Sequence, residues 1–123
     1  MTGQGVENMI GKLSEVEEKA IKELKDGLLK AYGSEVEVIR LFGSKARGDY
    51  SGDSDIDILV TVRSSDFSIW EGIQKIVASV SLKYNVFLSV KVMDLNHVSY
   101  LKHLDTALMR NIEKQGVDIW VKK

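Results

Sequence analysis

The sequence contains no cysteine, and its apolar stretches are all short. The absence of cysteine excludes disulfides and thiolate metal sites. No apolar run approaches the roughly 20 residues that a membrane-spanning helix needs. Residues 1–12 also lack the basic start and apolar centre of a signal peptide. We therefore expect a cytoplasmic protein with no membrane partner.

A strong excess of charge is lacking too, because the formal net charge is −1 over 123 residues. Such a balance gives no long-range attraction toward nucleic acid, so attraction to phosphate must be local. No basic groove or template-holding domain is evident, and we expect no nucleic-acid partner. The length suits one hydrophobic core. Residues 1–12, with three glycines, are expected to be a flexible leader, and residues 13–123 a single domain.

Hydrophobic periodicity predicts the order helix, strand, strand, helix, strand, helix, strand. The first helix should begin after Ser14, which has Glu17 three residues later in the form of a capping box, and should end near Gly33. The remaining elements are predicted as strands over 35–42, 55–62, 85–93 and 117–121 and as helices over 66–84 and about 97–115. This order indicates an α/β (α+β) fold in which helices pack on one mixed sheet.

The segment between the first two predicted strands, GSKARGDYSGDS, has features that folding alone does not require. Gly43 would let the chain turn sharply and let a ligand approach the backbone closely. Ser44 would then open a short helical turn whose free N–H groups favour phosphate. Lys45 and Arg47 would supply positive charge nearby. The alternative interpretation is an ordinary solvated turn.

Asp55 and Asp57 begin the next strand, although aspartate is poor strand material. Their stems should lie on one face, about 6.6 Å apart. The alternating apolar side chains of the same strand should point the opposite way, into the core: Ile56, Ile58, Val60 and Val62. Two carboxylates so placed can hold one ion or bridge two, and Mg²⁺ prefers such oxygen ligands together with substrate phosphates. The alternative is a pair of solvated carboxylates. The whole stretch therefore favours a site for a nucleoside triphosphate and Mg²⁺.

The pattern of Gly43-Ser44, ten intervening residues and Asp55-Ile56-Asp57 resembles the minimal nucleotidyltransferases, a branch of the polymerase-beta-like nucleotidyltransferase superfamily. The inner GSKARG and SDIDILV and the closing NIEKQGVDIWV are also similar to that branch. The resemblance implies the polymerase-beta-like fold. It further implies a small enzyme that often serves as the antitoxin of a helical HEPN partner, and some members transfer AMP from ATP to a tyrosine of that partner.

By position, the resemblance implies that Gly43 and Ser44 bind the nucleotide phosphates. The positive charges of Lys45 and Arg47 complete the predicted nucleotide-binding set, and the sequence leaves open which of the two turns inward. It implies that Asp55 and Asp57 are the catalytic residues and the ligands of one or two Mg²⁺ ions. Active members of the family add a third carboxylate from a later strand. Here the outward residues of the predicted strand 85–93 include no acid, and two groups remain as candidates for the third position: Lys91 and Asp94.

The candidates for the third position lead to two hypotheses. Lys91 is either a solvated strand lysine or a cleft residue that partly replaces a metal's charge or holds a phosphate. Asp94 has the wrong parity unless a bulge redirects it. The first hypothesis is a Mg²⁺-dependent enzyme that transfers a nucleoside monophosphate, AMP from ATP, to a hydroxyl of a HEPN-type partner. The second is a catalytically weak or inactive nucleotide-binding antitoxin that neutralises its partner by forming a complex. The sequence leaves the base preference and any homo-oligomer open.

Overall fold

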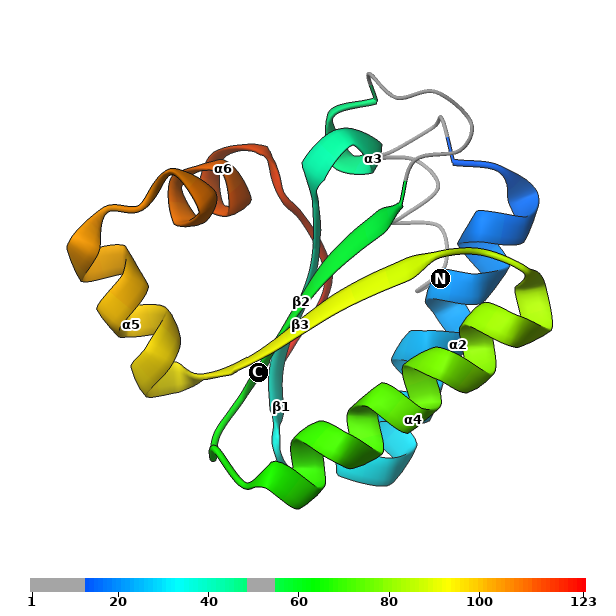
Figure 1. Ribbon diagram of the computed structural model, residues 1–123, viewed down its shortest axis with the longest axis horizontal. Coiled ribbons are helices and arrows are strands. Elements are labelled where there is room, and N and C mark those ends of the chain that lie inside the picture. Colours follow the sequence, from blue (N-terminus) through cyan, green and yellow to red (C-terminus); the bar gives the residue numbers. More distant parts are fainter. Residues whose placement is uncertain (1–12, 49–54) are drawn as a thin grey trace.

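The computed structural model of the chain describes residues 13–48 and 55–123 (Figure 1). The predicted leader, residues 1–12, lies outside the described residues. The helices are α2 (Glu15–Tyr32), α3 (Gly43–Arg47), α4 (Phe67–Tyr84), α5 (Leu95–Leu104) and α6 (Ala107–Gln115). The strands are β1 (Val36–Phe42), β2 (Ile56–Val62), β3 (Leu88–Asp94) and β4 (Val117–Val121).

The four strands form one mixed sheet in the order β3-β2-β1-β4. β1 is antiparallel to both β2 and β4, whereas β2 and β3 are parallel and are connected through α4. In this register Phe42 pairs with Asp57, and Asp57 pairs with Ser89. The carboxyl end of β1 therefore meets the amino ends of β2 and β3, and the short helix α3 follows β1 directly at this edge.

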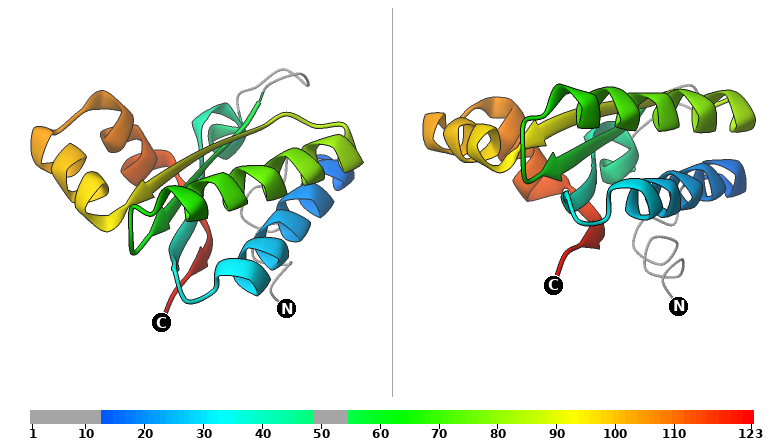
Figure 2. Two further views of the ribbon diagram at one scale, coloured as in Figure 1. Left: turned by 60° about the horizontal axis from the view of Figure 1, so that its bottom comes forward. Right: turned by 90° about the horizontal axis from the view of Figure 1, so that it is seen from below.

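Helices α2 and α4 lie side by side and cover one face of the sheet (Figure 2). The core beneath them is continuous and includes the predicted inward set of β2: Ile56, Ile58, Val60 and Val62. The alternation predicted for β2 is thus confirmed. On the opposite face, α6 covers a smaller cluster formed by Phe42, Leu59 and Ile112, with Met93 packed against it. Helices α2 and α4 therefore cover one face of the sheet, and helices α5 and α6 contact the other.

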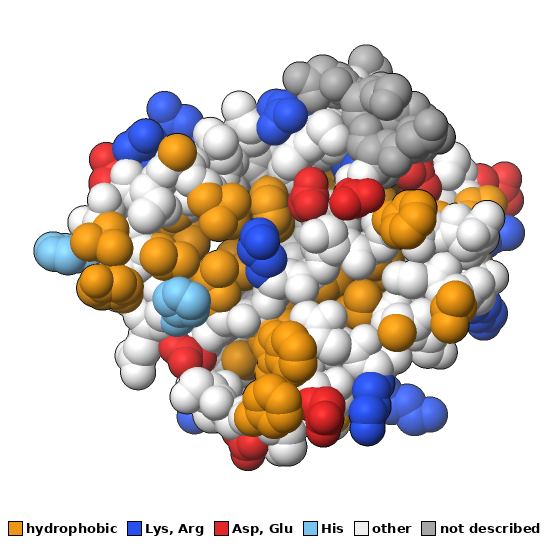
Figure 3. Space-filling model, in the orientation of Figure 1, with side chains coloured by type: hydrophobic (Ala, Val, Ile, Leu, Met, Phe, Trp, Pro, Cys, Tyr) orange, Lys and Arg blue, Asp and Glu red, His pale blue; other side chains and the backbone are white. Residues whose placement is uncertain are grey.

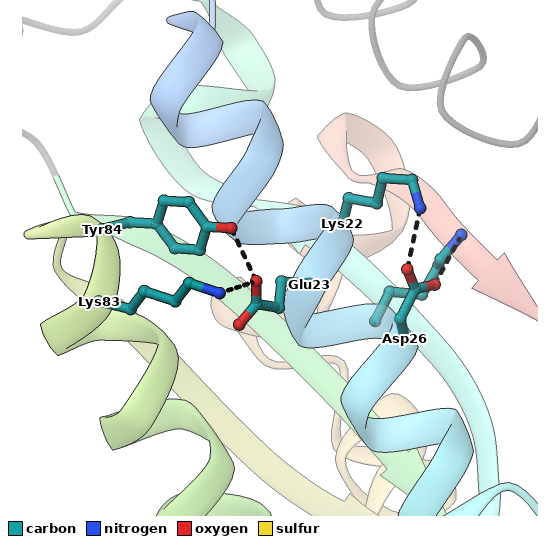
Figure 4. Close-up of polar contacts among 6 residues, drawn as sticks. Lys22, Glu23, Asp26, Lys83 and Tyr84 are labelled. Atoms are coloured by element: carbon teal, nitrogen blue, oxygen red, sulfur yellow. Dashed lines mark hydrogen bonds and ion pairs between the residues drawn. The ribbon is translucent and has the colours of Figure 1, made fainter.

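Small residues and an exposed polar cluster join α2 to α4. A Cβ at Gly72 would lie 1.7 Å from the Tyr32 hydroxyl oxygen, so the ring of Tyr32 occupies the space that a side chain at residue 72 would need. Near the other end, Glu23 accepts hydrogen bonds from Lys83 at 2.8 Å and from the Tyr84 hydroxyl at 2.7 Å (Figure 4). These contacts fix the helix pair that supports the sheet.

The start of α2 confirms the cap predicted at Ser14, but one predicted helix is wrong. Ser14 and Glu17 form the expected capping box. The expected single helix over about 97–115 is instead two helices, because Asp105 adopts a left-handed conformation with φ 55° and Thr106 caps a new helix through its side chain. Among the helices in the described ranges, none combines the length and apolar character needed to cross a membrane.

Candidate active site

The chain turns at Gly43 immediately after β1. Gly43 has φ 74°, a left-handed conformation that side chains disfavour. A Cβ at this position would also lie 2.4 Å from the Oδ2 atom of Asp57, which is too close for any side chain. Gly48 ends α3 with φ 78°, and its N–H donates to the Ser44 carbonyl at 2.8 Å. The backbone at Gly43 therefore lies directly against the Asp57 carboxylate.

Asp57 is half-buried at the amino end of β2, whereas Asp55 is exposed. Burial raises the pKa of Asp57, and the negative charge of Asp55 raises it further. The positive charges of Lys91 and Arg47 and a hydrogen bond from Ser89 act in the opposite direction, but the net shift of this pKa is upward. The structure thus brings both predicted aspartates together with two cations from separate elements.

Of the two candidates for the third position, the structure places only Lys91 near the aspartates. Lys91 pairs in register with Leu59, two residues beyond Asp57 on the same face, and its side chain is exposed. Asp94 is five residues beyond Ser89, about 16 Å along β3. Its carboxylate accepts from the His97 N–H at 2.7 Å and caps α5. The Asp94 carboxylate therefore lies at the far end of β3 and is engaged in capping α5.

The side chains of α3 point in different directions. Ser44 is half-buried beside Gly43. Lys45 is fully buried, and its Nζ atom lies 2.5 Å from the Glu17 Oε2 atom. Direct contact between Lys45 and a nucleotide would require this ion pair to open. Arg47 is exposed and donates to the Gln115 side chain at 3.3 Å, which links α3 to α6.

The structure adds three residues that contact predicted site residues but were not themselves predicted as part of the site: Glu17, Ser89 and Gln115. Glu17 was identifiable as part of a helix cap, but its second role toward Lys45 depends on how α2 lies against α3. Ser89 could have been found from the alternation of β3, had the parallel pairing with β2 been known. No sequence signal indicates Gln115, whose contact depends on the end of α6.

The donor set suits a divalent cation with oxygen ligands, although it is small. Within residues 13–48 and 55–123, no group of three histidine or acidic side chains could hold a metal ion. Asp57 is the second residue of β2 and Asp55 directly precedes this strand, and the raised pKa of Asp57 reflects in part the repulsion between them. A cation shared by the two carboxylates would relieve this repulsion. The residues present therefore fit Mg²⁺, with the remaining ligand positions left to substrate oxygens and water.

Comparisons with known proteins identify the family of this chain. Residues 22–123 match the family model described as polymerase beta, nucleotidyltransferase. Two relatives from Methanocaldococcus jannaschii are both named "Putative protein adenylyltransferase". The first is 37% identical over 100 residues, with 81% of this chain and 94% of the relative covered. The second is 32% identical over 100 residues, covering 80% and 94%.

Solved structures show the same fold. A structure described as "Crystal structure of the toxin-antitoxin with AMP-PNP" superposes with a TM-score of 0.52 at 24% identity, covering 81% of this chain and 73% of that chain. A mutant of the toxin-antitoxin pair MntA-HpeT gives a TM-score of 0.51 at 23% identity, covering 83% and 73%. The turn, the strand aspartates, the mixed sheet and the family match lead to one assignment. This chain belongs to the polymerase beta nucleotidyltransferase family and is a nucleotidyltransferase.

Proposed function

We propose that this nucleotidyltransferase transfers AMP from ATP to a hydroxyl group of a partner protein in a Mg²⁺-dependent reaction. The observation that carries the proposal is the approach of the Gly43 backbone to the Asp57 carboxylate, beside Asp55. That arrangement places a glycine turn, whose backbone a phosphate can approach closely, next to paired carboxylates. The relatives that are 37% and 32% identical support the acceptor class, because both are named as protein adenylyltransferases.

The proposal gives each residue of the site a role. The backbone of Gly43 and the hydroxyl of Ser44 contact the β- and γ-phosphates, and Arg47 adds positive charge at the other end of α3. Lys91 lies on β3, the strand next to the one that begins at the aspartates, where its ammonium can contact the triphosphate. These groups hold the triphosphate extended along the edge where β1, β2 and β3 meet.

Asp55 and Asp57 would hold Mg²⁺. When bound, Mg²⁺ supplies Lewis-acid polarisation of the α-phosphate and neutralises its charge. In the transfer, the acceptor oxygen forms a bond to the α-phosphorus while the bond from that phosphorus to the bridging oxygen breaks. Pyrophosphate leaves with the bonding electrons, and the hydroxyl proton passes to solvent water. The residues of the chain contribute mainly by fixing the triphosphate in line with the incoming oxygen.

We further propose that a HEPN-type protein presents the acceptor hydroxyl and that this chain serves as its antitoxin. Two structural relatives are toxin-antitoxin proteins, one of them solved with AMP-PNP. Large apolar side chains are also exposed over α5 and α6, where a protein partner could cover them (Figure 3): Leu95, Tyr100, Leu104 and Leu108.

The test is an incubation of the protein with α-labelled ATP, Mg²⁺ and a candidate HEPN partner, followed by measurement of label on protein. We expect transfer that is lost when Mg²⁺ is chelated and when Asp55→Asn and Asp57→Asn are combined. The matched control combines Asp26→Asn and Asp105→Asn, two exposed acids on other elements. A stable complex that binds Mg²⁺ and ATP without any transfer would contradict the enzymatic proposal and indicate an antitoxin that acts by occlusion.

A further inference from the structure

The buried ion pair between Lys45 and Glu17 has no part in the proposed binding of ATP and Mg²⁺. Lys45 is fully buried, although lysine is rarely so, and the Glu17 side chain is only 12% exposed. The two charges are 2.5 Å apart and come from different elements, Lys45 from α3 and Glu17 from the first turn of α2. The pair thus ties the turn that follows Gly43 to the helix layer behind the sheet.

The Glu17 carboxylate is itself held in place before it meets Lys45. Its Oε1 atom accepts from the Ser14 N–H at 2.9 Å, while the Glu17 N–H donates to the Ser14 hydroxyl at 3.1 Å. Burial alone would raise the pKa of Glu17, but the bonds from Lys45 and Ser14 outweigh it and hold this pKa below its ordinary value. Glu17 is therefore charged at neutral pH and presents a fixed anchor to Lys45.

Helix α3 needs such an anchor because it has only five residues. A helix this short is not stable by itself, so its position depends on contacts with the rest of the chain. Lys45 ties it to α2 on one side, and Arg47 ties it to α6 through Gln115 on the other. Gly43, which begins α3, lies against Asp57, so any displacement of α3 changes the gap between backbone and carboxylate.

We propose that Lys45 and Glu17 are positioning residues, which hold the Gly43–Ser44 turn against Asp57 and act on the nucleotide through that turn. This inference rests on the proposed nucleotide site. A buried ion pair contributes little net stability compared with apolar side chains of similar size. Its benefit here is a fixed direction and length, which an apolar contact between the same two helices would not impose.

A double-mutant cycle distinguishes positioning from direct contact. The variants are Lys45→Met, Glu17→Gln and their combination, and the probes are Mg²⁺ with ATP and Mg²⁺ with inorganic tripolyphosphate, measured by calorimetry well below each Tm. Glutamine still completes a capping box, so Glu17→Gln spares the start of α2. Lys25→Met is the matched control, because Lys25 is also a buried lysine but sits within α2, beside Asp26.

Positioning predicts that both single variants lose about tenfold or more in affinity for each probe, a loss of about 1.4 kcal/mol or more. The double variant should lose no more than either single variant, and the control should match the wild type. A loss limited to Lys45→Met would overturn the inference, since it would show that Lys45 contacts the phosphates directly. Unchanged affinity in both single variants would overturn it as well.

Amide hydrogen exchange separates this inference from the proposed function. Without any nucleotide, the amides of residues 43–47 should exchange at least tenfold faster in Glu17→Gln than in the wild type. A wild type that binds neither probe would refute the proposed function, while the exchange result would still decide whether the pair holds the turn. If Lys45→Met proves unfolded, the variant Lys45→Met with Glu17→Met replaces it, because two apolar side chains can fill the space of a buried ion pair.

Discussion

The backbone of Gly43 lies against the carboxylate of Asp57. A side chain at residue 43 would disturb this contact, because its Cβ would lie 2.4 Å from Oδ2. The left-handed φ of 74° adds a second reason for glycine. Gly43 directly follows β1, whose last residue, Phe42, pairs with Asp57 of β2. The closeness of the turn to the acid is therefore a consequence of the β1–β2 ladder.

Gly43→Ala should weaken binding of Mg²⁺ and ATP by at least tenfold and lower the free energy of unfolding by about 1–3 kcal/mol. Both effects follow from the left-handed backbone and from displacement of Asp57. Calorimetry and denaturant unfolding measure them. Gly48→Ala is the control, because Gly48 has φ 78° at the other end of α3. Wild-type affinity in Gly43→Ala would mean that the contact with Asp57 does not shape the site.

Asp57→Asn should stabilise the fold while abolishing Mg²⁺-dependent nucleotide binding. The folded-state pKa of Asp57 is raised above its ordinary value, so ionisation above that pKa costs folding free energy. After allowance for solvent screening, we expect a gain of about 0.5 kcal/mol at pH 7, or about 2 °C in Tm. Because the neutral carboxyl resembles the amide, the gain should vanish as the pH falls below about 3.9.

The measurement is thermal unfolding of wild type and Asp57→Asn across pH 3 to 7 in the presence of a chelator. A matched control is Asp66→Asn. The pKa of Asp66 is lowered, first by the Ser68 hydroxyl and then by the Ser68 N–H, so this substitution should cause no gain at pH 7. Equal Tm values for wild type and Asp57→Asn at every pH would contradict the electrostatic argument.

Gly72→Ala should destabilise the protein by about 1–3 kcal/mol through overpacking between α2 and α4. The added methyl would meet the hydroxyl of Tyr32 at 1.7 Å and its Cζ atom at 2.7 Å. Tyr32→Leu in the same chain should recover most of that loss, so the two substitutions should be strongly non-additive in denaturant unfolding. Gly27→Ala provides the comparison, because its Cβ would meet Ile76 at a more tolerable 3.3 Å.

Arg40→Met should loosen α6 and β4 without disturbing α2 or α4. The guanidinium donates to the Ile112 carbonyl at 2.9 Å and to the Glu113 carbonyl at 3.1 Å, and it pairs with Asp118. Loss of these bonds should cost about 1–3 kcal/mol. Hydrogen exchange should show faster amides in residues 107–121 and unchanged amides in α2. Uniform acceleration throughout the chain would contradict this local account.

The sequence predicted the features that depend on local patterns. The alternation of apolar side chains over 55–62 identified a strand and its core-facing side, and the cap at Ser14 identified the start of a helix. Each of these signals lies within a single strand or helical turn. The Gly43 turn and the two aspartates were found in the same way. The short α3 was also expected, since twelve residues separate the adjoining strand ends.

Other features depend on how elements lie in space, and local patterns in the sequence do not indicate them. The break at Asp105 was hidden because the apolar spacing continues through it, and only Thr106 as a cap could have signalled a new helix. Lys45 was assigned to the nucleotide because positive charge in such a turn favours phosphate, whereas its burial depends on the position of Glu17 on α2. Likewise, the distance of Asp94 from the aspartates follows from the parallel pairing of β3.

The central place of β1 in the sheet has a consequence for the order of folding. Its pairing with β2 spans a short loop, whereas Arg40 of β1 finds its α6 partners 72 and 73 residues later in the chain. Closing the shorter loop costs less conformational entropy. We expect the ladder that carries the aspartates to form before α6 and β4 close over Phe42, which pulsed exchange during refolding would reveal as early protection of β1 and β2 and late protection of β4.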